Sequence, residues 1–149
     1  MSEIIQRPSI ILLAEDDDDD FLLTQKAFKE SRLINHLFRV KDGEELMDYL
    51  LHRGSYQDRE KFPMPMLILL DLNMPRKNGR EALKEIRANA ELKKIPVVAL
   101  TTSQAQEDVN LLYELGVNSF VKKPVSFDQL AKVIKVLEQY WFEIVRLPR

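Results

Sequence analysis

The sequence contains no cysteine, which excludes disulfide bonds and thiolate metal sites. It also lacks any apolar run near the roughly 18 residues that a membrane-spanning helix needs, and its first residues lack the apolar core of a signal peptide. Basic residues are not in excess, because 22 Lys and Arg stand against 24 Asp and Glu for a formal net charge of −2. We therefore expect a cytoplasmic protein with no broad basic surface for nucleic acid and no membrane segment.

The length of 149 residues suits a single domain with one hydrophobic core. Short apolar runs of strand length alternate with amphipathic segments of helical periodicity. The expected strands occupy residues 10–14, 36–40, 66–70, 97–100 and 119–122, and the expected helices occupy residues 18–31, 44–52, 79–89, 105–115 and 126–145. This alternation predicts an α/β fold with a single doubly wound, five-stranded parallel sheet. The polar residues 54–65 are expected to form one long surface loop.

Four of the predicted strands run into residues with phosphate or metal chemistry. These are Glu15 and Asp16 after the first strand, Asp71 after the third, Thr101 after the fourth and Lys123 after the fifth. Because the carboxyl ends of parallel strands line one crevice of an open sheet, we expect these side chains to converge. The predicted site then holds three carboxylates, a hydroxyl and an ammonium group.

Such a carboxylate cluster needs positive charge, since two carboxylates 4 Å apart repel by about 4 kcal/mol at an effective dielectric of 20. Lys123 supplies one charge and a divalent cation would supply more. Oxygen ligands favour Mg²⁺ over zinc, with Mn²⁺ as a substitute. The alternative is that Lys123 simply forms an ion pair with Asp71 and no metal is needed.

The run of five aspartates from Asp16 to Asp20 requires a separate interpretation. Its last four members lie where a helix is expected to begin, and carboxylates there cap free backbone N–H groups and favour the helix dipole. An EF-hand is excluded, because a loop starting at Asp16 would have Phe21 where glycine is required and Ala27 where the closing glutamate is required.

In combination, these motifs resemble the signature of the receiver domains of two-component response regulators. The matching residues are Glu15-Asp16, Leu69-Leu-Asp-Leu-Asn-Met-Pro75, Gly79, Thr101 and Lys123-Pro124. The resemblance covers residues 10 to about 139. It implies a flavodoxin-like strand order of 2-1-3-4-5 and a single receiver domain over residues 1–149, with an extended C-terminal helix and tail at about 140–149.

The resemblance also implies a chemistry for the site. Asp71 would accept a phosphoryl group from a sensor histidine kinase. The chain would then be a signalling protein rather than an enzyme, with self-catalysed phosphotransfer and autodephosphorylation. Mg²⁺ would bind Asp16, Asp71 and the backbone carbonyl of Asn73, with Glu15 acting through a water molecule. Lys123 would pair with the phosphoryl group.

Two residues would take part in switching. Thr101 matches the hydroxyl that moves toward the acyl phosphate, and Phe120 matches an aromatic switch position, although it lacks the hydroxyl of a tyrosine switch. The peptide bond between Lys123 and Pro124 is a candidate for the cis form.

A narrower likeness is to the stand-alone regulators that pair with phytochrome histidine kinases. The segments that carry it are residues 71–80, 95–103, 54–65 and the ending at 140–148. This likeness implies a phytochrome kinase as a candidate partner.

Three other functions remain as alternatives. A Mg²⁺-dependent phosphohydrolase of the haloacid-dehalogenase type also attacks with a strand-end aspartate, but it uses an acid two positions later, where this chain has Asn73. A receiver-like scaffold that is never phosphorylated would be expected to lose some of the acids or the lysine. A flavodoxin-like FMN protein would need a hydroxyl- and glycine-rich loop where this chain has its aspartates.

The last predicted helix carries two apolar stripes. The first consists of Phe127, Leu130, Ile134, Leu137 and Trp141, and the second of Val133, Val136, Tyr140 and Ile144. The first stripe suits packing on the sheet. The second predicts a homodimer that phosphorylation strengthens or rearranges, unless the chain's own tail covers it.

Overall fold

The computed structural model of the chain describes residues 10–29, 37–71, 78–101, 110, 113–117, 119–122, 127–137 and 139. The strands are β1 (Ile11–Ala14), β2 (Leu37–Val40), β3 (Leu67–Asp71), β4 (Val97–Thr101) and β5 (Ser119–Lys122). The helices are α1 (Asp18–Phe28), α2 (Gly43–Leu50), α3 (Gly79–Ala88) and α5 (Phe127–Leu137), with 3-10 helices η2 (Gly54–Tyr56) and η3 (Leu92–Lys94). The helix expected at 105–115 and the tail from residue 140 lie largely or wholly outside the described residues.

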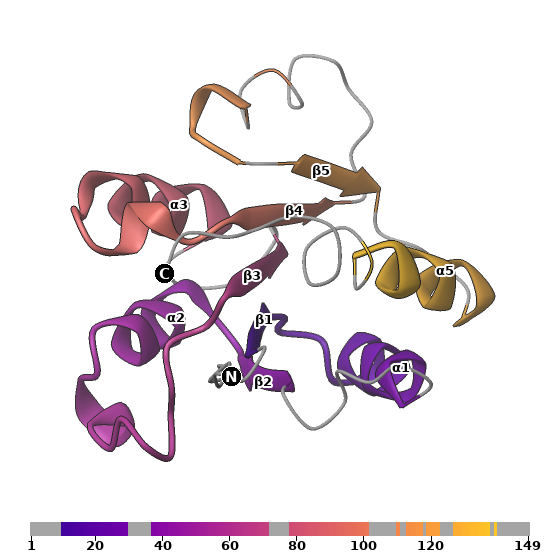
Figure 1. Cartoon of the computed structure of the whole chain (residues 1–149), viewed down its shortest axis with the longest axis horizontal. Coiled ribbons are helices and arrows are strands. Elements are labelled where there is room, and N and C mark those ends of the chain that lie inside the picture. The colour runs from indigo at the N-terminus through magenta and orange to yellow at the C-terminus, as the bar shows by residue number, and fades with distance from the viewer. Residues whose placement is uncertain are drawn as a thin grey trace, which may run out of the picture.

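The strands form one parallel sheet in the order β2-β1-β3-β4-β5. Helices α1 and α5 lie on one side of the sheet, and α2 and α3 lie on the other (Figure 1). The predicted parallel α/β architecture is confirmed, and it follows from the crossovers that parallel strands require. No helix among the described residues is long and apolar enough to cross a membrane.

Alternate residues of the central strands pack on opposite faces of the sheet, which explains why these strands are apolar throughout. The residues packed with α1 and α5 are Ile11, Leu13, Leu67, Leu69, Val98 and Leu100, and those packed with α2 and α3 are Leu12, Ala14, Ile68, Leu70, Val97 and Ala99. All of them are buried. Because helices cover both faces of the sheet, the polar residues at its strand ends are the candidates for a functional site.

Side chains cap the start of three helices. Asp17 caps α1 and accepts a hydrogen bond from the backbone N–H of Asp20 at 2.9 Å, as the acidic run predicted. Asn78 and Glu81 form a reciprocal capping box at α3. Asp42 caps α2, so this helix begins at Gly43, one residue before the predicted start.

The segment at residues 54–65 lies mostly at the surface, as expected, but it is not an irregular loop throughout. The segment begins with the η2 turn, and its Tyr56 and Phe62 pack against the core. Their rings lie 5.2 and 5.8 Å from the ring of the buried Tyr49, whose hydroxyl donates to the carbonyl of Pro63 at 2.7 Å. Two aromatic side chains in a mostly polar segment are enough to hold it against α2.

Candidate functional site

Three carboxylates meet at the carboxyl end of the sheet. Glu15 and Asp16 follow β1, and Asp71 is the last residue of the neighbouring strand β3. The register pairs Ala14 with Leu70, so the residues that follow lie side by side. One oxygen from each carboxylate lies within 4.8 Å of the others. The structure therefore brings together the acidic group that the strand ends predicted.

The three acids differ in their access to solvent. Glu15 is 1% exposed and Asp71 is 3% exposed, whereas Asp16 is not buried. Two of the negative charges are thus held where water screens them poorly, which increases their mutual repulsion. A cation or a positively charged group would approach from the side of Asp16.

The spacing of these oxygens suits a hard divalent cation. Octahedral Mg²⁺ holds its oxygen ligands at roughly 2.0–2.1 Å, which places ligand oxygens about 3 to 4 Å from one another. The observed limit of 4.8 Å is slightly wider. Direct binding by two of the acids, with the third acting through a water molecule, would therefore fit this donor set.

The main chain at Glu15 is fixed from the side of strand β2. Its N–H donates to the carbonyl of Val40 at 2.9 Å, and its own carbonyl accepts from Arg39 Nε at 2.9 Å. Its carboxylate accepts from the N–H of Asp17 at 3.3 Å. The turn that carries two of the three acids is therefore held at its backbone.

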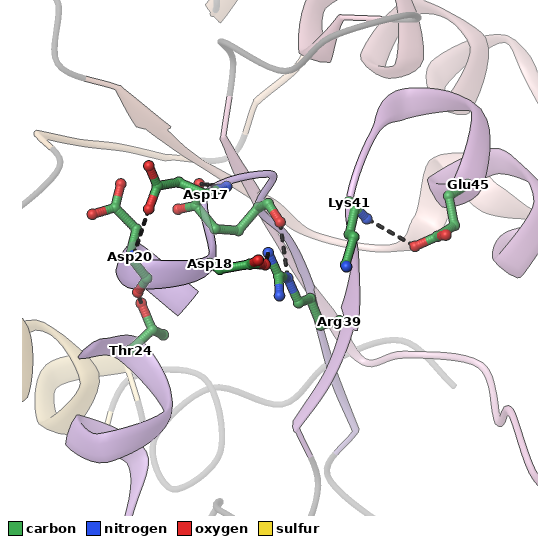
Figure 2. Close-up of polar contacts among 8 residues, drawn as sticks. Asp17, Asp18, Asp20, Thr24, Arg39, Lys41 and Glu45 are labelled. Atoms are coloured by element: carbon green, nitrogen blue, oxygen red, sulfur yellow. Dashed lines mark hydrogen bonds and ion pairs between the residues drawn. The ribbon is translucent and has the colours of Figure 1, made fainter. Parts of the chain in front are cut away.

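Arg39 makes further contacts with α1. Its Nη2 atom lies 2.9 Å from Asp18 Oδ1, and its guanidinium lies 4.4 Å from the centre of the Phe21 ring. Figure 2 shows Arg39 reaching from its strand toward the start of this helix, with Asp18 beside the guanidinium.

Arg39 was not among the site residues predicted from the sequence. A usable signal existed in the alternation along β2, because Phe38 and Val40 pack on the α2 and α3 face while Leu37 packs on the other. Arg39 must then face α1, where an unpaired cation would be unusual.

The other predicted site residues are only partly described. Thr101 ends β4 and pairs in register with Lys122 of β5, so the expected hydroxyl residue stands at the same end of the sheet. The side chains of Thr101 and Phe120 are not described. Asn73, Lys123 and Pro124 lie outside the described residues, so the roles and the cis peptide bond assigned to them stay predictions.

Comparison with known proteins gives consistent matches over most of the chain. The family model of the response regulator receiver domain matches residues 11–135. Response regulator Rcp1 from Synechocystis sp. is 44% identical over 148 residues, covering 99% of both chains.

Two solved structures are similar over nearly the full length. The phosphorylated cyanobacterial phytochrome response regulator RcpA is 39% identical, with a TM-score of 0.87 over 96% of this chain and 100% of that one. The Mn²⁺-bound form of Rcp1 is 44% identical, with a TM-score of 0.83 over 95% of this chain and 100% of that one. These chains are similar to the present one in both sequence and fold.

Proposed function

Because this chain belongs to the response regulator receiver domain family, we propose that Asp71 accepts a phosphoryl group from a sensor histidine kinase in a Mg²⁺-dependent reaction. The observation that carries the proposal is the convergence of Glu15, Asp16 and Asp71 at one end of the sheet. The carboxylate of Asp71 would attack the phosphorus of a phosphohistidine, so that an O–P bond forms and the P–N bond breaks with its electron pair on the imidazole.

The residues around Asp71 would bind the cation and the phosphoryl group during this transfer. Mg²⁺, or Mn²⁺ in its place, would neutralise charge on the transferring phosphoryl oxygens when bound. Asp16, Asp71 and the Asn73 carbonyl would hold the cation, and Glu15 would orient a water molecule on it. Lys123 would pair with the phosphoryl group. The Mn²⁺-bound form of the similar regulator Rcp1 supports the use of a divalent cation.

A phytochrome kinase is the partner that we propose. Support comes from the similarity to the phytochrome response regulator RcpA, which extends over 96% of this chain. The same near-complete coverage supports a single receiver domain over the residues of this chain. Signalling would then pass through a change of the protein's surface, with later loss of the phosphate by self-catalysed hydrolysis.

We propose that this change of surface runs from Thr101 to Phe120. Thr101 would hydrogen-bond the new phosphoryl group and draw the following loop toward it, which frees space for the Phe120 ring. The register supports the pathway, because Ala99 pairs with Phe120 and Thr101 pairs with Lys122 in the neighbouring strand.

The surface proposed to respond is a homodimer interface on α5. Val136 is 61% exposed there, whereas Leu130 and Ile134 pack against the sheet as the first stripe predicted. Val133 is half-buried against the same cluster, so the second stripe is not wholly free. Tyr140 and Ile144, the other members of this stripe, lie outside the described residues.

One experiment tests the central proposal. The protein is incubated with acetyl phosphate and Mg²⁺, and its intact mass is measured with and without the substitution Asp71→Asn. We expect one added phosphoryl group on the wild type, none on the variant and none in excess chelator. Labelling of the variant, or labelling without metal, would contradict the proposal.

A further inference from the structure

The geometry points to Arg39 as a positioning residue of the metal site. We propose that it sets the position of Glu15 and Asp16, and thereby the affinity of the site for Mg²⁺. The inference depends on the proposed function only in placing these two acids at the cation, Asp16 as a direct ligand and Glu15 through a water molecule. Arg39 itself would touch neither the cation nor the phosphoryl group.

The strongest contact is the one to the main chain. Arg39 Nε donates to the carbonyl of Glu15 at 2.9 Å, and the Glu15 N–H donates to the carbonyl of Val40 at 2.9 Å. Residues of strand β2 therefore hydrogen-bond both the N–H and the carbonyl of Glu15, directly after the end of β1. Since Asp16 is the next residue, its direction depends on the plane of the peptide that Arg39 holds.

The ion pair with Asp18 adds little by itself. The Asp18 side chain is 74% exposed, and exposed pairs contribute roughly 0–1 kcal/mol. Within the described part of the chain, Arg39 Nη2 also makes no hydrogen bond of good geometry, although it lies 2.9 Å from Asp18 Oδ1. This contact is therefore a charge pairing by distance, and the directed bond is the one from Nε.

The pairing nevertheless limits the electrostatic effect of Arg39 on the site. A free cation beside three carboxylates would compete with Mg²⁺, but the charge of Arg39 is balanced by Asp18. The side chain is also confined by the Phe21 ring at 4.4 Å and is only 13% exposed. Arg39 thus acts through geometry more than through charge.

This distinction separates arginine from lysine at position 39. Lysine keeps the positive charge, but it has no Nε–H on a planar fork and cannot bond the Glu15 carbonyl while stacking on Phe21. Arg39→Lys is therefore the informative variant, with Arg39→Gln as a second. The control is Arg53→Lys, because Arg53 also pairs with an aspartate, Asp48, at 3.2 Å but does so on the exposed surface at the end of α2.

The test measures the Mg²⁺ dissociation constant by calorimetry, the melting temperature without metal, and the rate of phosphorylation by acetyl phosphate across Mg²⁺ concentrations. We expect both Arg39 variants to bind Mg²⁺ roughly 10–100-fold more weakly, as is typical when a residue that orients a metal ligand is lost. Their phosphorylation rate should return toward that of the wild type at saturating Mg²⁺, and Arg53→Lys should leave the dissociation constant unchanged.

The outcomes separate this inference from the proposed function. If Arg39→Lys lowers the melting temperature but keeps the wild-type Mg²⁺ affinity, Arg39 is only structural and the inference is overturned. The same holds if lysine restores an affinity that glutamine loses, since charge would then suffice. A wild type that binds Mg²⁺ but is not phosphorylated would instead overturn the proposed function. A wild type that binds no Mg²⁺ would overturn both.

Discussion

At the scale of the residue, Asp16 is the member of the acidic group that can be changed with the least damage to packing, because it is not buried. We expect Asp16→Asn to raise the melting temperature of the metal-free protein. Near solvent, the relief of one carboxylate repulsion is about 1 kcal/mol. For a domain of this size that corresponds to roughly 2–4 °C. Thermal melts of the wild type and of Asp16→Asn without Mg²⁺ measure this difference.

The same melts repeated with Mg²⁺ test whether Asp16 binds the cation. A ligand that binds only the folded state stabilises it by an amount that grows with the logarithm of its occupancy, so Mg²⁺ should raise the melting temperature less in Asp16→Asn than in the wild type. Asp19→Asn is the control, since it makes the same chemical change in the exposed first turn of α1. Equal Mg²⁺ shifts in all three proteins would place the cation elsewhere.

Tyr56 gives a pH dependence with a defined sign. Burial, and after it the nearby carboxylate of Glu45, raises the pKa of the Tyr56 phenol from 10.0 to about 12. The folded state therefore favours the neutral phenol, and this contribution to stability is complete below pH 10.0 and is lost as the pH rises toward 12. Urea unfolding across this range should show a shallower decline for Tyr56→Phe than for the wild type. Identical slopes would contradict the assignment.

Single residues were predictable from the sequence where a strand end fixed their position. Glu15, Asp16 and Asp71 each follow an apolar run, so parallel topology was enough to bring them together. Arg39 was not predicted, because its contacts depend on the exact placement of α1 over β2. A one-dimensional pattern gives the face of a strand on which a side chain lies, but not the carbonyl that it reaches.

At the scale of the element, Arg87 joins the end of α3 to two other segments. Its Nε donates to the carbonyl of Gly116 at 2.8 Å, and its Nη1 donates to the carbonyls of Lys93 and Ile95 at 2.8 and 3.0 Å. Burial lowers the pKa of this guanidinium. The three carbonyls replace the water that it has lost, so its side chain is not free to move aside.

Gly116 tests this junction. Its φ is 100°, and a Cβ atom there would lie 2.9 Å from Cγ and Nε of Arg87. We expect Gly116→Ala to destabilise the protein by about 1–3 kcal/mol in urea unfolding, since both backbone strain and the contact with Arg87 oppose it. Gly54→Ala is the matched control, because Gly54 has a φ of 58° but nothing within 4 Å.

Gly54→Ala should lower the free energy of unfolding by less than Gly116→Ala does, since only the backbone conformation opposes an alanine at position 54. In the double variant Arg87→Ala/Gly116→Ala, the loss should be smaller than the sum of the two single losses. Strict additivity would show that Arg87 does not oppose the alanine.

Helices were predicted well from the sequence where the helical spacing of their apolar residues was regular. The buried residues of α3 are those expected from helical spacing, namely Ala82, Leu83 and Ile86, with Gly79 at its start. The segment at 54–65 is mostly exposed, as its polar composition indicated, but that composition gave no sign of the two aromatic rings that pack on Tyr49.

At the scale of the whole molecule, the proposed assembly depends on the second apolar stripe of the last helix, in which Val136 is 61% exposed. We expect Val136→Lys and Tyr140→Lys to give a folded monomer, because each places a charge inside the proposed apolar interface. Sedimentation before and after treatment with acetyl phosphate and Mg²⁺ measures the oligomeric state. Leu22→Lys is the control, since Leu22 is similarly exposed but lies on α1.

The wild type sets the baseline for this experiment. We expect it to form a dimer that phosphorylation strengthens or rearranges, and Leu22→Lys to behave in the same way. A wild type that remains monomeric in both conditions would rule out the homodimer. A dimer that survives both lysine substitutions would place the interface on another surface.

The gathered carboxylates also bear on how such a chain would change under different kinds of selection. Under the proposed function, the mutual repulsion of these acids would oppose folding, so a library selected only for resistance to heat should accumulate amides at positions 16 and 71 and lose its signal. Selection for signalling would retain the acids and tolerate a less stable fold. The residues found at positions 16 and 71 of the surviving variants would therefore show which of the two kinds of selection had been applied.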